Sequence, residues 1–255
     1  MFKRGDKIDL EITDFAFGGK GISKIESDDQ RTVVFVPSAY PGQKVHVVIS
    51  AKKKKYYEAK LLDILERSPV EVINEYQPIS GAPYIYVPIK EQERVKKEST
   101  LDTFSRLSGI ENVNEIFDTF ISAPDHFFYR NKMEYSFSSI EHCLESDSEK
   151  DDAFALGFKR RGTWWKVESL NKASGLFDQE WEEKLKLIRD YLEKTNLKAW
   201  HPPQKTGFFR HLVVRKSFAS DKLLVNLVTA SEDLKDFDSK AFSEFIKGLM
   251  GERVA

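Results

Sequence analysis

The sequence predicts an α+β protein with two parts, a small β-barrel over residues 1–68 and an antiparallel sheet packed against helices over residues 69–255. Short runs of alternating apolar and polar residues, separated by glycine and proline turns, fill the first part. A longer run of the same period marks the second part at Tyr129–Phe137. Apolar residues at helical spacing lie between the later runs, which is typical of an α+β domain.

The composition narrows the possible functions. Lys and Arg (40) and Asp and Glu (41) nearly cancel to a net charge of −1, so nucleic-acid binding would need a local basic face. Cys143 is the single cysteine, which excludes an internal disulfide and any site built from several thiolates. The histidines show no metal-ligand spacing, so no metal site is predicted. We find no signal-peptide core or membrane-spanning run and expect a cytoplasmic monomer with no membrane partner.

The first part reads as a barrel of short strands. Ile8, Leu10 and Ile12 alternate with polar residues, and the stretch 45–49 alternates in the same way. The glycines of residues 17–21 mark a tight turn. Short strands at this spacing favour an antiparallel barrel close in kind to an oligonucleotide-binding fold.

A lysine run next to aromatic residues is the first candidate RNA-binding feature. Positive charge attracts phosphates and aromatic rings stack on bases, which together favour sequence-tolerant binding of single strands. The alternative is a solvated turn. The candidates in this part are Phe15, Phe17, Lys20, Lys52, Lys53, Lys54, Lys55, Tyr56 and Tyr57.

The ordered turns of this part resemble those of a known domain. Asp14–Gly21, Val33–Pro37, Pro41-Gly42 and the lysine run are similar to a TRAM domain. The resemblance implies a small barrel that binds the RNA substrate of an RNA-modifying enzyme.

The second part combines predicted helices and strands. A charged helix is expected over 89–107, ended by Gly109, with Leu101, Phe104 and Leu107 on its apolar side. Two further amphipathic helices carry apolar residues at i, i+3 or i+4 spacing, and Asp178 is the expected N-cap of the first. The apolar positions of these two helices are Trp181, Leu185, Ile188 and Leu192, then Phe242, Phe245, Ile246 and Leu249.

The predicted strands of the second part carry polar residues suited to RNA. Arginine makes bidentate phosphate contacts and stacks on bases, so an RNA-facing surface is one interpretation; pairing with acidic neighbours such as Glu134 is the other. His211 is interpreted as a core histidine rather than a donor to RNA. The candidates here are Arg130, Asn131, Lys132, Lys159, Arg160, Arg161, Arg210 and Arg215.

Three segments in order are similar to one enzyme family. Tyr129–Phe137, Leu156–Gly162 and Phe209–Arg215 resemble central-domain segments of the RNA (uracil-5-)-methyltransferases, which are class I S-adenosylmethionine-dependent enzymes. The resemblance implies rRNA or tRNA as partner and S-adenosylmethionine as the methyl donor of the complete enzyme.

The sequence also departs from that family. Alignment places the four iron–sulfur cysteines of the family at Gln77, Pro83, Tyr86 and Ala173, none of which ligates iron, so no cluster is expected. We find no catalytic cysteine segment and no glycine-rich loop for the methyl donor. The expectation is that the Rossmann-like methyltransferase domain is missing, with no catalytic or cofactor-binding residue in this chain.

Three hypotheses follow. The chain is the RNA-binding portion of a truncated uridine-C5 methyltransferase, or it works with a catalytic domain on another chain. The third is a stand-alone RNA-binding module.

Overall fold

The computed structural model describes residues 2–16, 18–27, 30–143 and 148–254. The chain divides into two compact units. The first unit comprises Met1–Asn74 and Ala82–Pro124, and the second comprises Glu75–Gly81 and Asp125–Ala255. The division expected from the sequence, at residue 68, stays a prediction. By contacts, residues 82–124 group with the N-terminal sheet.

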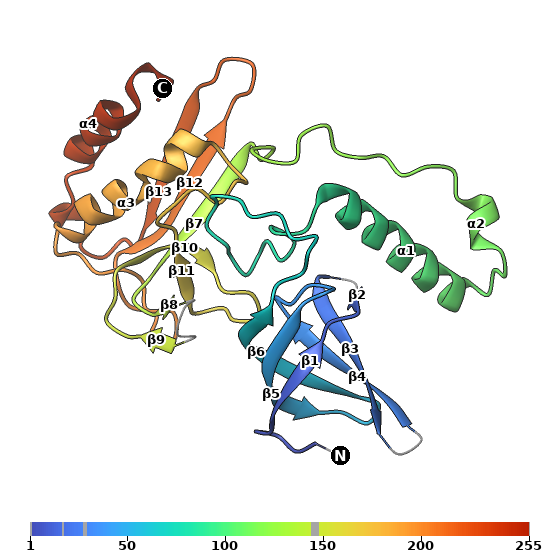
Figure 1. Cartoon of the computed structure of the whole chain (residues 1–255). Coiled ribbons are helices and arrows are strands. Elements are labelled where there is room, and N and C mark those ends of the chain that lie inside the picture. Colours follow the sequence, from blue (N-terminus) through green and yellow to red (C-terminus); the bar gives the residue numbers. More distant parts are fainter. Residues whose placement is uncertain (1, 17, 28–29, 144–147, 255) are drawn as a thin grey trace. The chain divides into compact units, whose positions relative to one another are not determined.

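The first unit contains a six-stranded sheet in the order β1-β5-β6-β4-β3-β2 (Figure 1). Alternate residues of its strands form one apolar core that includes Leu10, Val36, Val45 and Val47. Most neighbours are antiparallel, but β4 and β6 pair in parallel, so the expectation of a wholly antiparallel barrel is wrong. The strands are β1 (Lys7–Glu11), β2 (Asp14–Ala16), β3 (Lys20–Ser27), β4 (Gln30–Pro37), β5 (Lys44–Lys52) and β6 (Tyr56–Glu66).

A long helix, α1 (Ile89–Ser108), packs on this sheet through a second small core of Phe15, Tyr40, Val87 and Val95. Gly109 ends α1 in the left-handed conformation with φ 71°, as predicted. The side of α1 that was predicted to be apolar is not buried against the rest of the unit, however. Phe104 and Leu107 are 56% and 83% exposed, whereas Val95, in the first half of the helix, is buried. The short helix α2 (Val113–Ile116) follows.

The second unit contains a seven-stranded sheet in the order β13-β12-β7-β10-β11-β8-β9. The neighbours in this sheet are antiparallel except β8 and β11, which run parallel. The predicted antiparallel sheet is therefore corrected to a mixed one. Its strands are β7 (Lys132–Ser138), β8 (Glu141–Cys143), β9 (Ser148–Lys150), β10 (Ala155–Lys159), β11 (Val167–Ser169), β12 (Phe209–Lys216) and β13 (Leu223–Thr229).

Two helices, α3 (Gln179–Glu193) and α4 (Ser239–Met250), cover one face of this sheet (Figure 1). The predicted apolar stripe of α3 is confirmed, since Trp181, Leu185, Ile188 and Leu192 are all fully buried. The short helices η1 (Leu234–Asp236) and η2 (Gly251–Arg253) flank α4. No helix in the described part of the chain is long and apolar enough to cross a membrane.

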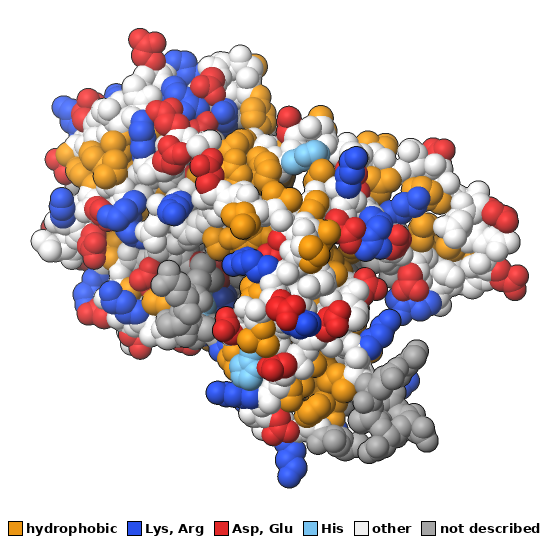
Figure 2. Space-filling model, in the orientation of Figure 1, with side chains coloured by type: hydrophobic (Ala, Val, Ile, Leu, Met, Phe, Trp, Pro, Cys, Tyr) orange, Lys and Arg blue, Asp and Glu red, His pale blue; other side chains and the backbone are white. Residues whose placement is uncertain are grey.

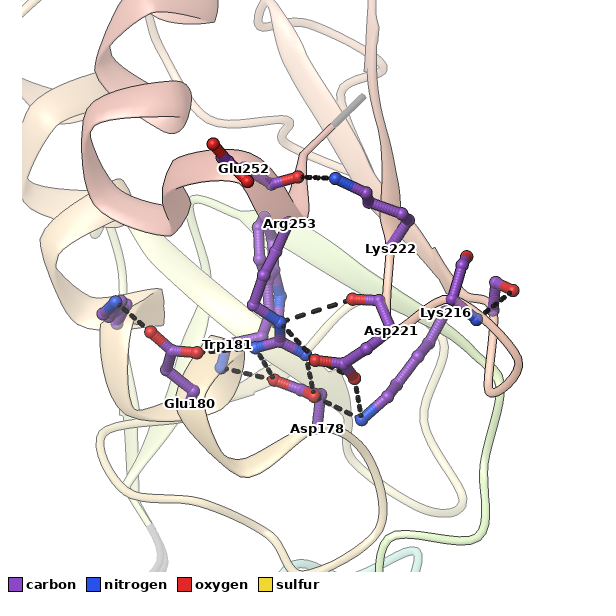
Figure 3. Close-up of polar contacts among 11 residues, drawn as sticks. Asp178, Glu180, Trp181, Lys216, Asp221, Lys222, Glu252 and Arg253 are labelled. Carbon is purple, nitrogen blue, oxygen red and sulfur yellow. Dashed lines mark hydrogen bonds and ion pairs between the residues drawn. The ribbon is translucent and has the colours of Figure 1, made fainter.

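The start of α3 is the centre of an ion-pair network (Figure 3). Asp178 accepts the backbone N–H of Trp181 at 3.0 Å, which confirms it as the N-cap. Its carboxylate also accepts from Arg253 at 2.6 Å and Lys216 at 2.7 Å. Burial alone raises the pKa of Asp178, but these hydrogen bonds outweigh it and lower the pKa to about 2. The network joins the N-terminus of α3, the end of β12 and η2.

Candidate nucleic-acid interface

The hairpin between β5 and β6 carries the lysine tip, defined as Lys52–Lys55. The backbone N–H of Lys53 donates to the carbonyl oxygen of Tyr56 at 2.8 Å and closes the turn. All four lysine side chains are exposed. Antiparallel pairing of β5 with β6 therefore concentrates positive charge at one end of the first unit, where it can attract phosphates.

The aromatic residues expected to accompany the lysines point elsewhere. Tyr57 is 6% exposed and packs edge-on against Phe2, and Tyr56 packs against Phe35 at a ring separation of 5.3 Å. Phe15 is 5% exposed in the core beneath α1. The expectation that Phe15 and Tyr57 stack on bases is therefore corrected, because both rings are used in packing.

The two remaining candidates of the glycine turn are Phe17 and Lys20. Lys20 is half-buried at the start of β3, opposite Ala16 and Pro37. Phe17 lies outside the described residues. The lysine tip is thus the part of the first unit with the chemistry expected for phosphate binding.

The second unit offers polar side chains on the sheet face opposite α3 and α4. Tyr135 and Leu212 point toward the helices, so their neighbours in the alternation point the other way. We call this the open face. Its residues are Lys132, Glu134 and Ser136 of β7, Lys159 of β10, and His211 and Arg215 of β12.

His211 occupies the middle of the open face. Its Nδ1 lies 3.4 Å from Ser136 Oγ and 3.6 Å from a Glu134 carboxylate oxygen. Partial burial lowers the pKa of His211; Glu134 opposes this effect, and the cations Lys159 and Arg210 add to it. The side chain is 26% exposed, so the interpretation as a core histidine is wrong. A neutral imidazole here can donate or accept a hydrogen bond.

Arg160 is committed to an internal ion pair. Its guanidinium donates to the Glu168 carboxylate at 3.1 Å, and that carboxylate is fully buried. Glu168 also accepts the backbone N–H and the hydroxyl of Ser80, at 2.9 and 3.0 Å. Burying this carboxylate is tolerable because each oxygen has a donor. We therefore interpret Arg160 as structural, the alternative left open by the sequence.

Two arginines lie over aromatic rings. Arg210 lies 4.1 Å from the ring centroid of Trp200, and Arg130 lies 5.9 Å from that of Tyr129. Such stacking orients the planar guanidinium without neutralising its charge. Sequence reasoning missed Trp200, because it lies in the loop before β12 and follows no strand or helix period. The contact between Arg210 and Trp200 joins residues that are ten positions apart, and no sequence pattern predicts it.

The other predicted residues lie at or next to the ends of strands β7, β10 and β12. Lys132 is 3.6 Å from Glu134, and Arg215 is exposed on the neighbouring strand. Asn131 is exposed, and its carbonyl oxygen accepts the backbone N–H of Lys216. Arg161 is exposed, and its backbone N–H donates to Ser80 Oγ at 2.7 Å. Figure 2 shows Lys and Arg side chains interspersed with Asp and Glu, in keeping with the balanced net charge.

Two of the four positions aligned with cluster cysteines, Gln77 and Ala173, lie in the second unit. The backbone N–H of Gln77 donates to the carbonyl oxygen of Ala173 at 2.8 Å, so the structure brings these two positions together. The Gln77 side chain donates to the carbonyl oxygen of Ser169 and accepts from the backbone N–H of Asn171. A hydrogen-bonding glutamine thus connects the two segments. Among the described residues, no group of three or more His, Cys, Asp or Glu side chains could hold a metal ion.

The chain is similar in sequence to one known domain family and to several known proteins. Residues 2–62 match the TRAM domain family. The chain is 30% identical to an uncharacterised RNA methyltransferase of Chlorobaculum tepidum over 91% of its length and 49% of that protein. It is 27% identical to one of Clostridium tetani over 97% of its length and 51% of that protein. The chain therefore contains a TRAM domain and is related to RNA methyltransferases over nearly its whole length.

A solved structure shows the same fold. It is Pyrococcus abyssi tRNA (uracil-54, C5)-methyltransferase in complex with S-adenosyl-L-homocysteine, with a TM-score of 0.55 and 19% identity. The likeness covers 90% of this chain and 49% of that one. The chain thus spans about half the length of the proteins it matches. The prediction that a methyltransferase domain is missing is not supported, because the likeness to a methyltransferase covers 90% of the chain. The predicted fold class included that absence and is corrected to two units, each with its own mixed sheet.

Proposed function

We propose that this chain forms the RNA-binding portion of an S-adenosylmethionine-dependent RNA methyltransferase that converts uridine to 5-methyluridine in rRNA or tRNA. The observation that carries the proposal is the relationship to RNA methyltransferases across 91% of the chain, TRAM domain included. The geometry agrees with it. The lysine tip and the open face are exposed in their own units and carry the charge and hydrogen-bonding groups that RNA recognition uses.

The division of labour between the two surfaces follows from their chemistry. Flexible lysines at a hairpin tip attract phosphates without reading sequence. The open face holds its cations on three paired strands, so it can orient a structured RNA. Together they would hold the substrate in place for methyl transfer.

S-adenosylmethionine would supply the methyl group. Two cavities in the described part of the chain have volumes of a few hundred Å³. One, of about 260 Å³, lies between β13 and α4, and the other, of about 380 Å³, lies beside α1. Neither cavity combines a glycine-rich loop with the acidic residue that holds a ribose. These cavities do not fit the cofactor, and no methyl-transfer step is derived from their residues.

Two measurements test the proposal. Fluorescence anisotropy with labelled tRNA and rRNA transcripts should show binding to this chain at low salt, and affinity should fall steeply as salt rises. No binding at low salt would overturn the RNA-binding role. Nucleoside mass spectrometry of RNA from cells lacking the gene should show loss of 5-methyluridine at one site. Unchanged 5-methyluridine would overturn the methyltransferase assignment.

A further inference from the structure

An exposed tryptophan stands on the turn between β10 and β11, residues 160–166. Trp164 is 58% exposed, and its ring meets that of Trp165 edge-on at 5.5 Å and 74°. Tryptophan is the side chain with the largest apolar surface to lose from water, so an indole left this exposed has a stacking face available. The predicted RNA-binding set did not include it.

The backbone around Trp164 is held in place by hydrogen bonds. The N–H of Arg160 donates to the carbonyl oxygen of Lys166 at 3.0 Å. The N–H of Thr163 donates to the carbonyl oxygen of Arg160, also at 3.0 Å. Ser138 Oγ donates to the carbonyl oxygen of Trp165 at 2.9 Å. A side chain on a backbone already ordered loses less conformational entropy when a ligand stacks on it.

The turn adjoins the open face. Ser138 alternates with Phe137 on β7, so it points to the same side as Ser136. Strand β11 approaches β10 closely beside it, since a Cβ placed on Gly157 would lie 2.0 Å from the carbonyl oxygen of Glu168. The hydrogen bond from Ser138 to the backbone of Trp165 therefore places the turn, and Trp164 with it, next to the face that carries His211.

Cationic side chains accompany the indole. Arg161 is exposed three residues before Trp164, and Lys159 lies on the adjoining strand. Lys166 lies 5.8 Å from the ring centroid of Trp165 and is paired with Glu149. An aromatic face beside cations matches a nucleotide, which presents a flat base and a charged phosphate.

We propose that Trp164 is a stacking platform for one unpaired base of the RNA substrate, with Arg161 contacting the adjoining phosphate. The proposal rests on the RNA-binding function above and names the part of the RNA that this site takes. A base within a duplex is stacked on both sides and cannot use the indole, whereas a base in a loop or bulge can.

The experiment compares Trp164→Ala, Trp164→Phe and the parent chain. The ligands are a labelled RNA hairpin with an unpaired loop and the same RNA annealed to its complement. Trp164→Ala should weaken hairpin binding about tenfold to a hundredfold and leave duplex binding unchanged, while Trp164→Phe should retain most of the affinity. The salt dependence should keep its slope, because stacking releases no counterions.

Leu187→Ala is the matched control, because Leu187 is 51% exposed on α3, away from the open face. Each variant is checked by thermal unfolding, where an exposed side chain should cost little. If the parent binds no RNA, the proposed function fails. If the parent binds and Trp164→Ala behaves like Leu187→Ala, only the stacking platform is overturned; equal losses on hairpin and duplex would overturn it as well.

Discussion

The lysine tip and the open face place positive charge in different ways. At the tip, four consecutive lysines project from one turn, and the tyrosines that follow them pack back into the first unit. On the open face, the cations come from three strands and sit beside other groups, as Lys132 does beside Glu134. The tip therefore supplies charge, and the face supplies charge in a defined arrangement.

This difference shows that the residue type alone does not tell whether an arginine in or next to a strand is free to bind RNA or holds the fold together. Arg160 and Arg215 look equivalent in the sequence. One neutralises a buried carboxylate, and the other is exposed. The contrast predicts that changes at the tip alter RNA affinity alone, whereas changes in the sheet can alter stability.

The largest expected effect comes from disrupting the close approach of β10 and β11 at Gly157. Gly157→Ala would force a Cβ to within 2.0 Å of the Glu168 carbonyl oxygen, so β10 and β11 would separate. We expect a loss of about 3–5 kcal/mol in the free energy of unfolding, measured with urea. Gly248→Ala is the control, since its Cβ meets no atom within 4 Å inside α4 and should stabilise by about 0.5–1 kcal/mol. Equal stability of the two variants would contradict the close approach of the two strands at Gly157.

Removing the lysine tip should act on binding. Changing all four lysines at 52–55 to alanine should lower RNA affinity by about tenfold to a hundredfold at low salt and flatten its salt dependence. The matched control replaces four lysines on α3 and α4, at positions 186, 194, 240 and 247. Titration by anisotropy compares them. Equal losses in both variants would show that only total charge matters.

Acid should weaken the second unit through Asp178. Its folded pKa of about 2 lies below the ordinary 3.8, so its contribution to stability is present above pH ~4 and is lost as pH falls toward 2. The shift corresponds to about 2 kcal/mol. Urea unfolding at a series of pH values should show Asp178→Asn less stable at pH 6 and less sensitive to acid. A parallel pH profile for both proteins would refute the ion-pair network.

The smallest expected effect is the difference in stability between variants of Arg160 and of Arg215. Arg160→Ala should cost about 1–2 kcal/mol in unfolding free energy, because Glu168 keeps its Ser80 donors but loses its cation. Arg215→Ala should leave stability nearly unchanged and weaken RNA binding a few-fold. Thermal unfolding and anisotropy on both variants check this. The reverse assignment would show that the exposed arginine is the structural one.

Periodicity predicted helices better than surfaces. The stripe on α3 and its Asp178 cap were predictable, because a helix buries residues at i, i+4 and i+7 and a carboxylate suits its first turn. For α1 the same reasoning found the helix and its Gly109 end, yet misjudged Phe104. A stripe shows which residues share a side, whereas burial depends on whether another element reaches that side.

The candidate site was harder to predict. Glycines and lysines beside Phe15 and Tyr57 in the sequence favour exposure, but both rings are buried in apolar cores of the first unit. The parallel pairing of β8 with β11 has no local signal, since it joins segments that are apart in the chain. Trp164 and Trp200 lie in loops, where no period assigns them a direction.

Arg253 links η2 to the electrostatics of the start of α3. Its guanidinium contacts Asp178, Glu180 and Asp221 at 2.6, 2.6 and 2.9 Å, so one cation serves three acids. A substitution that removed the guanidinium would leave Asp178 and Asp221 with Lys216 as their shared cation, and Glu180 with Lys184. A change at η2 is thus an electrostatic change at a helix start 75 residues away in sequence.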